Sequence, residues 1–103
     1  MIYVHLADGF EEIEAITVTD VLRRAGAEVC TVSVLDKLEV KGTHEIEVKA
    51  DIPFEKADYE SCEMIVLPGG MPGTTNLLKH EGLMHEIRKA AGEGKWVCAI
   101  CAA

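Results

Sequence analysis

The residue with the clearest potential for chemistry is Cys101, which follows the apolar run Trp96–Ile100. A run of this kind, entered from Gly92–Lys95, predicts a strand buried on both faces, with Cys101 at its carboxyl end. The small residues Ala102 and Ala103 suit a sharp strand-to-helix turn that presents a side chain, as in the nucleophile elbow of hydrolases. A helix beginning there would raise the thiolate fraction of Cys101. The alternative is a small buried residue without reactivity.

Glu14 is the second candidate, because it lies on a predicted helical stripe that is otherwise apolar. The other positions of that stripe are Val18, Val21, Leu22 and Ala25. Burial and the neighbouring carboxylates of Glu11 and Glu12 favour a protonated Glu14, able to donate a hydrogen bond to a thiolate. The alternative is a solvated first-turn glutamate, a role that suits Glu11 and Glu12 better than Glu14.

Two glycines after a predicted strand, Gly69 and Gly70, let backbone N–H groups approach a ligand closely. With the N–H of Ala102 they could form an oxyanion hole, although at least one of them is equally suited to a plain tight turn. No glycine-rich phosphate motif is present, so phosphate and dinucleotide binding lack support.

The remaining cysteines and histidines do not complete a second site. Cys98 and Cys101 have Cys-x-x-Cys spacing, but their odd offset points the two side chains to opposite faces of a strand unless the turn begins before Cys101. A lone Cys-x-x-Cys pair also supplies only two of the four ligands of a structural zinc site, so we expect no metal. We expect no cofactor either. The four histidines are expected to be structural or solvated, which leaves no Cys-His dyad; they are His5, His44, His80 and His85.

Composition and net charge limit the classes of binding partner. A net charge of −8 without a basic cluster argues against nucleic acid and anionic membranes, so small molecules or proteins are expected. No apolar run reaches the length of a membrane span, and the N-terminus lacks the charged region of a signal peptide, which predicts a cytoplasmic location. The four cysteines, in or beside predicted strands, are expected to be reduced thiols.

The pattern along the chain predicts alternating strands and helices. Strands are expected over 2–7, 28–35, 62–67 and from Trp96 onward, with helices from near Phe10 to Gly26 and over 74–91. Asp8 is expected to cap the first helix, and Gly82 to break or kink the second. Residues 38–52 predict a small hairpin that covers a sheet edge, and residues 53–61 predict one helical turn.

This order predicts an α/β fold: a doubly wound, mostly parallel sheet of the flavodoxin-like or Rossmann-like kind, in a single domain over residues 1–103. Ligands of such sheets bind beyond the carboxyl ends of the strands. Such domains usually have further strands and a helix after the elbow, so we expect this chain to be incomplete there.

Four separated segments together resemble the ThiJ/PfpI superfamily, and look closest to its Parkinsonism-associated deglycase branch. They are Ala7–Glu14, Asp20–Gly26, Val66–Gly70 and Ala99–Ala102. Members are nearly twice this length, so the resemblance implies the N-terminal part of a longer domain, with a second chain carrying the remainder as one possibility. The helix after the elbow and a downstream histidine are then missing.

The resemblance implies a homodimer in which a nucleophilic cysteine matches Cys101 and a protonated glutamate matches Glu14. Oxyanion donors match the N–H groups of Gly70 and Ala102. The implied activity is glyoxalase or deglycase chemistry on small reactive carbonyls, without a cofactor. Alternatives are a redox-sensing or chaperone-like stress protein that uses an oxidisable Cys101, and a PfpI-type cysteine peptidase or amidase.

Overall fold

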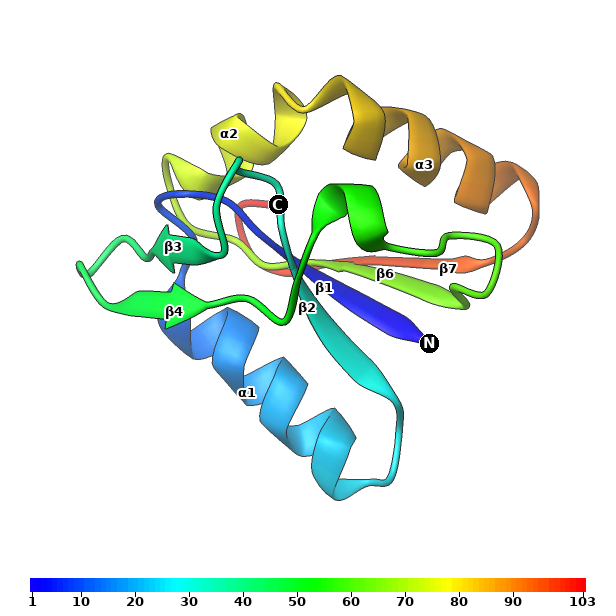
Figure 1. The fold of residues 1–103 in the computed structure, drawn as a ribbon, viewed down its shortest axis with the longest axis horizontal. Helices are drawn as coiled ribbons and strands as arrows, with labels where there is room; N and C mark the ends of the chain where they lie inside the picture. Colours follow the sequence, from blue (N-terminus) through cyan, green and yellow to red (C-terminus); the bar gives the residue numbers. More distant parts are fainter.

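A five-stranded parallel sheet forms the centre of the molecule in the computed structural model, which describes all residues 1–103 (Figure 1). Its strand order is β5-β2-β1-β6-β7. The strands are β1 (Ile2–Leu6), β2 (Val29–Ser33), β5 (Ile52–Pro53), β6 (Met64–Leu67) and β7 (Trp96–Ala99). The mostly parallel, flavodoxin-like architecture predicted from the sequence is therefore confirmed.

Helices cover both faces of this sheet. Helix α1 (Glu12–Arg24) lies on one face, and α2 (Gly73–Leu78) and α3 (Glu81–Gly92) lie on the other. A 3₁₀ turn, η1 (Phe54–Lys56), follows β5. None of the helices is long and apolar enough to cross a membrane.

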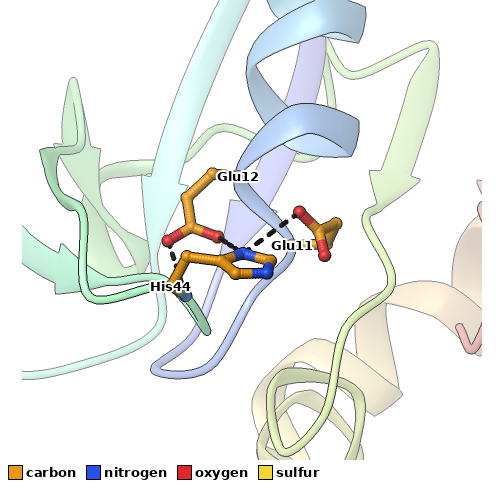
Figure 2. Close-up of side chains that lie close together, drawn as sticks. All are labelled: Glu11, Glu12 and His44. Atoms are coloured by element: carbon orange, nitrogen blue, oxygen red, sulfur yellow. Dashed lines mark hydrogen bonds and ion pairs between the residues drawn. The ribbon is translucent and has the colours of Figure 1, made fainter.

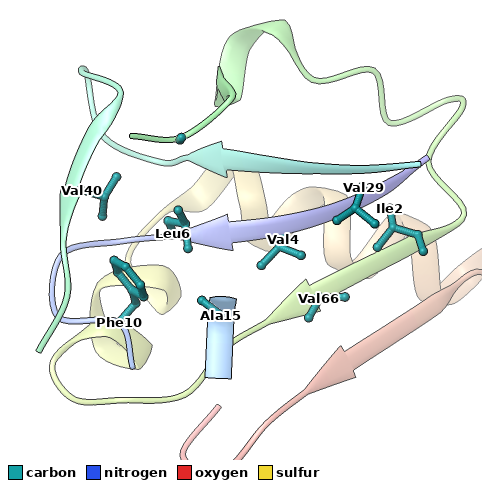
Figure 3. Close-up of a cluster of buried hydrophobic side chains, with 9 residues drawn as sticks. Ile2, Val4, Leu6, Phe10, Ala15, Val29, Val40 and Val66 are labelled. Carbon is teal, nitrogen blue, oxygen red and sulfur yellow. The ribbon is translucent and has the colours of Figure 1, made fainter. Parts of the chain in front are cut away.

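The central strand β1 supplies both cores because its side chains alternate between the two faces. Ile2, Val4 and Leu6 point toward α1 and pack with Phe10 and Ala15 (Figure 3). The other cluster contains Tyr3, Ile65 and Ala90, with Ala90 contributed by α3.

A polar pair, buried His5 and half-buried Tyr59, lies among the side chains on the α3 side. His5 is fully buried, with its Nε2 2.6 Å from the Tyr59 hydroxyl and its Nδ1 3.3 Å from the Val66 carbonyl oxygen. Since the carbonyl can only accept, Nδ1 carries the proton and Tyr59 donates to Nε2. Burial lowers the pKa of His5 to about 4. The ring is therefore a neutral core residue.

The predicted hairpin exists but does not cover a sheet edge. Strands β3 (Glu39–Lys41) and β4 (Glu47–Lys49) pair antiparallel in a sheet of their own. Backbone hydrogen bonds join the hairpin to the loop after the central strand, from Gly9 N–H to Lys41 O and from Thr43 N–H to Phe10 O, both 2.8 Å. The prediction was wrong because sequence alternation defines a hairpin but not the place where it docks.

The start of α1 differs from the prediction. Glu11, not Asp8, is the N-cap, and its carboxylate accepts from the Ile13 N–H. The Asp8 carboxylate instead accepts from the Lys41 N–H of the hairpin at 3.1 Å. The buried residues of α1 are Glu12, Ala15 and Thr19. Of the predicted stripe, Val18 and Leu22 are partly buried against the core, whereas Val21 and Ala25 are exposed.

The predicted second helix is two helices. The break falls at Lys79 and His80, before Gly82, because His80 caps α3. Its Nδ1 accepts from the Leu83 N–H at 2.9 Å. A histidine cap is not among the common helix-start signals, so the break was assigned to the glycine.

The strand β7 is not buried on both faces. It is the last strand at one side of the sheet, Trp96 is 68% exposed and Val97 36% exposed. An apolar sequence predicts only that a strand can be buried on both faces. Whether it is buried depends on the elements that pack beside it in space. In this chain β7 pairs only with β6.

Candidate functional site

The candidate site lies at the carboxyl ends of β1, β6 and β7, where three loops meet. The loop after β1 contains Gly9 and Phe10, the loop after β6 contains Gly69 and Gly70, and the turn after β7 contains Cys101. Backbone hydrogen bonds join the first two loops, from Glu11 N–H to Gly69 O at 2.9 Å and from Gly73 N–H to Gly9 O at 3.1 Å.

Cys101 occupies a turn with a left-handed backbone conformation. The ladder of β7 ends at Ala99, and Ile100 makes one more hydrogen bond, to Leu67 O at 3.1 Å. Cys101 follows with φ of +53°. A left-handed residue other than glycine costs about 1–3 kcal/mol, and such residues cluster at functional sites. The thiol is exposed, in contrast to the buried Cys62.

Glu14 and the Cys101 turn meet at Gly69. The Gly69 N–H donates to Glu14 Oε1 at 2.8 Å. A β-carbon at position 69 would lie 2.6 Å from that same oxygen, 2.6 Å from the Ile100 carbonyl oxygen and 3.0 Å from the Ala102 nitrogen. Glycine is therefore required at 69 to let the carboxyl of Glu14 and the backbone around Cys101 approach from two sides.

The predicted oxyanion donors are unpaired in the structure. The N–H groups of Gly70 and Ala102 donate to no acceptor within the chain. Gly70 has φ of +94°, and a β-carbon there would lie 2.5 Å from the Glu11 nitrogen. Both donors are thus available to a ligand, and their catalytic role stays a prediction.

A second cluster, which we call the hairpin anchor, joins Glu12 to the hairpin turn at His44 and Ile46. Figure 2 shows the side chains of Glu11, Glu12 and His44 in this cluster. The Glu12 carboxylate is buried and accepts from the His44 N–H at 2.8 Å and from the Ile46 N–H at 3.2 Å. His44 Nδ1 lies 2.9 Å from Glu12 Oε1 and 3.6 Å from Glu11 Oε1. Gly42 packs so closely on Glu12 that no β-carbon would fit.

The hairpin anchor holds an ion pair. Burial alone would raise the pKa of Glu12, but the hydrogen bonds from His44 and from the backbone outweigh it and lower this pKa to about 2. The hydrogen bond to Glu12, with the charges of Glu11 and Glu12, raises the pKa of His44. Ligand atoms of Glu11, Glu12 and His44 lie within 4.8 Å of one another. Nδ1 of His44 is engaged with Glu12, so a metal would have to displace that contact.

The hairpin anchor was missed by the sequence interpretation, which took Glu12 to be solvated and His44 to be structural or solvated. The two residues are 32 positions apart, and the carboxylate is buried only because the hairpin turn folds over it. A weak signal was present in the sequence. Gly42 precedes His44 in the predicted hairpin turn, and the start of the first helix is acidic.

Cys98 and Cys101 do not form a joint site. All four cysteines are unpaired in the structure. Cys98 is half-buried on the α1 face of β7, whereas Cys101 is exposed beyond the end of that strand. The turn does begin before Cys101, but the two thiols remain in different surroundings.

Comparison with known proteins gives one consistent match. The model of the DJ-1/PfpI family matches residues 1–103. Protein DJ-1 homolog B of Arabidopsis thaliana is 39% identical over 101 residues, which are 98% of this chain and 23% of that protein. Deglycase PH1704 of Pyrococcus horikoshii is 35% identical over 96 residues, 92% of this chain and 56% of that protein.

Solved structures agree with this match. The structure of oxidized Toxoplasma gondii DJ-1 superimposes with a TM-score of 0.93 at 38% identity, over 97% of this chain and 54% of that one. Drosophila melanogaster DJ-1beta gives a TM-score of 0.95 at 31% identity, over 99% of this chain and 55% of that one. The chain thus spans about half the length of these solved relatives.

Proposed function

The chain belongs to the DJ-1/PfpI family, and on that premise we propose that it carries the nucleophile and the acid of a glyoxalase or deglycase reaction on small 2-oxoaldehydes or their adducts. Cys101 is the nucleophile and Glu14 is the proton carrier. The observation that carries the proposal is the junction at Gly69, which contacts both the Glu14 carboxyl and the backbone on either side of Cys101.

In the first step the Cys101 thiolate adds to the aldehyde carbon of the substrate. The carbon–sulfur bond forms, and the carbonyl electron pair moves onto oxygen. The unpaired N–H groups of Gly70 and Ala102 stabilise this oxyanion. Glu14 then gives its proton to the oxygen, which yields a hemithioacetal.

In the second step Glu14, now a carboxylate, takes the proton from the former aldehyde carbon and returns it to the neighbouring carbon, while the hydroxyl proton of the hemithioacetal moves to the oxygen of that neighbouring carbon. This converts the hemithioacetal into the thioester of a 2-hydroxy acid. Water cleaves the thioester, which releases the 2-hydroxy acid and restores the thiol. No oxidant or cofactor is consumed.

The test is methylglyoxal turnover by protein that contains this chain. Replacing Cys101→Ser or Glu14→Gln should lower kcat/KM at least about 100-fold, whereas Cys30→Ser, on the far strand β2, should leave it unchanged. Unchanged turnover by Cys101→Ser would refute the proposal.

A redox-sensing role is the second candidate, supported by the exposure of Cys101 compared with the other three cysteines. Two equivalents of peroxide would each transfer one oxygen to sulfur and leave as water, giving first a sulfenate and then a sulfinate. Mass spectrometry after mild peroxide should then find two added oxygens on the Cys101 peptide. Equal oxidation of Cys30 and Cys62 would contradict this role.

The PfpI-type peptidase alternative is less well supported, because a cysteine peptidase needs a histidine base beside the thiol. Three of the four histidines are engaged elsewhere: His5 with Tyr59, His44 with Glu12, and His80 with the Leu83 N–H. The fourth, His85, is exposed on α3 and makes no hydrogen bond to Cys101. Peptidase activity of protein containing this chain would therefore require a histidine outside residues 1–103.

A further inference from the structure

The loop between β6 and α2 contains the Gly70 N–H, which donates to no acceptor within the chain. The direction of this N–H is tied to the peptide bond between Gly69 and Gly70. That bond is planar and trans, so the Gly69 carbonyl and the Gly70 N–H point in opposite directions. The Gly69 carbonyl accepts from the Glu11 N–H at 2.9 Å. The Gly70 N–H therefore points away from Glu11.

Gly70 itself does little to keep this direction. Its φ is +94°, and a glycine has less restricted backbone angles than any other residue. The direction of its N–H thus depends on how the rest of the loop is held. The Gly70 carbonyl accepts from the Thr74 N–H at 2.9 Å, and the next carbonyl, that of Met71, accepts from the Thr43 hydroxyl at 3.1 Å. Of the hydrogen bonds to these loop carbonyls, only the one from Thr43 comes from a side chain.

Thr43 is placed for this contact by the docked hairpin. It lies in the turn between β3 and β4, and its N–H donates to the Phe10 carbonyl, in the loop after β1, at 2.8 Å. Thr43 thus bridges two loops of the site: its backbone holds the loop after β1 and its hydroxyl holds the loop after β6. Glu12 holds the neighbouring His44, so the turn keeps its place when only the Thr43 hydroxyl is removed.

We propose that Thr43 is a positioning residue of the candidate site, whose hydroxyl holds the Met71 carbonyl and thereby keeps the Gly70 N–H directed at the substrate oxygen. The inference rests on the proposed function, in which this N–H stabilises the oxyanion that forms when Cys101 adds to an aldehyde. Such a donor is effective only when it is held within about 0.5 Å of the productive geometry. Thr43 acts through the loop and contacts no reacting atom.

Three variants separate the hydroxyl from the rest of the side chain. Thr43→Val keeps the shape of threonine and loses the hydroxyl, whereas Thr43→Ser keeps the hydroxyl. Thr75→Val is the matched control, because the Thr75 hydroxyl lies 4.0 Å from the Met71 sulfur and makes no hydrogen bond to the Met71 carbonyl. Thr43 is exposed, so circular dichroism should show an intact fold in both of its variants.

Two measurements on protein that contains this chain test the role of the hydroxyl. NMR relaxation without substrate should give a Gly70 amide order parameter of about 0.85 in wild type, Thr43→Ser and Thr75→Val, and a value that falls toward about 0.6 in Thr43→Val. In methylglyoxal turnover, Thr43→Val should lower kcat at least about fivefold and change KM less than about twofold, because the oxyanion is absent from the bound substrate. Thr43→Ser should restore kcat.

The two measurements also separate this inference from the proposed function. If Cys101→Ser kept wild-type turnover, the proposed function would fail, and the Gly70 order parameter alone would decide whether Thr43 holds the N–H. An order parameter that Thr43→Val leaves unchanged would overturn the positioning role. So would an unchanged kcat of Thr43→Val in an enzyme that depends on Cys101. Equal losses in Thr43→Val and Thr75→Val would also contradict it, because the effect would then not arise at the Met71 carbonyl.

Discussion

Gly69 is clamped by the first turn of α1, since its N–H donates to Glu14 Oε1 at 2.8 Å and its carbonyl accepts from the Glu11 N–H at 2.9 Å. Both hydrogen-bonding groups of one loop residue are thus held by one helix end. The carboxyl of Glu14 is fixed by this clamp, and the backbone around Cys101 lies against the same glycine.

The first prediction concerns that glycine. Gly69→Ala should lower the free energy of unfolding by about 1–3 kcal/mol, because its methyl group would collide with Glu14 Oε1 and the Ile100 carbonyl oxygen. It should also change the rate at which iodoacetamide labels Cys101. Gly92→Ala is the control: nothing lies within 4 Å of its β-carbon, and urea denaturation should show a change below about 1 kcal/mol. If Gly69→Ala matched wild type in both its free energy of unfolding and its Cys101 labelling rate, the contacts at Gly69 would not be close enough to exclude a methyl group.

Glu12→Gln should destabilise the protein at neutral pH by about 1–3 kcal/mol, because the amide cannot accept from three donors at once. The pKa of Glu12 is about 2 in the folded state, below its ordinary value of 4.5. Its stabilising effect is therefore complete above pH 4.5 and is lost as the pH falls toward 2. Urea titrations of wild type and Glu12→Gln should converge over that range. The exposed Glu28→Gln should match wild type throughout.

His44 should titrate above its ordinary value, because the hydrogen bond to Glu12 raises its pKa. Its contribution to stability is then complete below pH 6.5 and is lost as the pH rises through the raised pKa. An NMR titration of the His44 ring should give a midpoint above 6.5 that moves back toward 6.5 in Glu12→Gln. A midpoint that Glu12→Gln leaves unchanged would show that the ion pair does not form in solution.

Tyr59→Phe should lower the free energy of unfolding by about 1–3 kcal/mol, because it removes the only donor to a buried ring nitrogen of His5. The double variant His5→Phe with Tyr59→Phe should lose less than the sum of the two single variants, since neither the ring nitrogen nor the hydroxyl of this pair is then left without its partner. Additive losses in a urea double-mutant cycle would indicate that the two side chains are not coupled.

The sequence was sufficient to predict the strands and helices that are specified by a local pattern of residues. Alternating and continuous apolar runs placed β1, β2, β6 and β7, and the acidic start and glycine end placed α1, which together specify the parallel sheet. Chain order and strand ends also predicted that Cys101, Glu14 and Gly70 would converge. The structure brings the Glu14 carboxyl and backbone atoms of Ile100 and Ala102 to Gly69, the neighbour of Gly70. The convergence of the three predicted residues stays a prediction.

What the sequence could not provide depends on contacts between distant segments. The burial of Glu12 depends on a hairpin turn 32 residues away, and the exposure of β7 depends on which strands lie beside it. Glu11 is the N-cap because α1 begins at Glu12, and the Asp8 carboxylate accepts from the hairpin instead. In each case the local signal was compatible with more than one partner.

The first turn of α1 has a consequence for the synthesis of the protein. Glu11, Glu12 and Glu14 hold Gly69 and the hairpin turn, and Gly69 in turn abuts Ala102. On the ribosome, the junction of Glu14, Gly69 and Ala102 cannot form until residue 102 has been made and has left the exit tunnel. The rate at which a thiol reagent labels Cys101, followed on stalled chains of increasing length, would therefore show the chain length at which this junction forms.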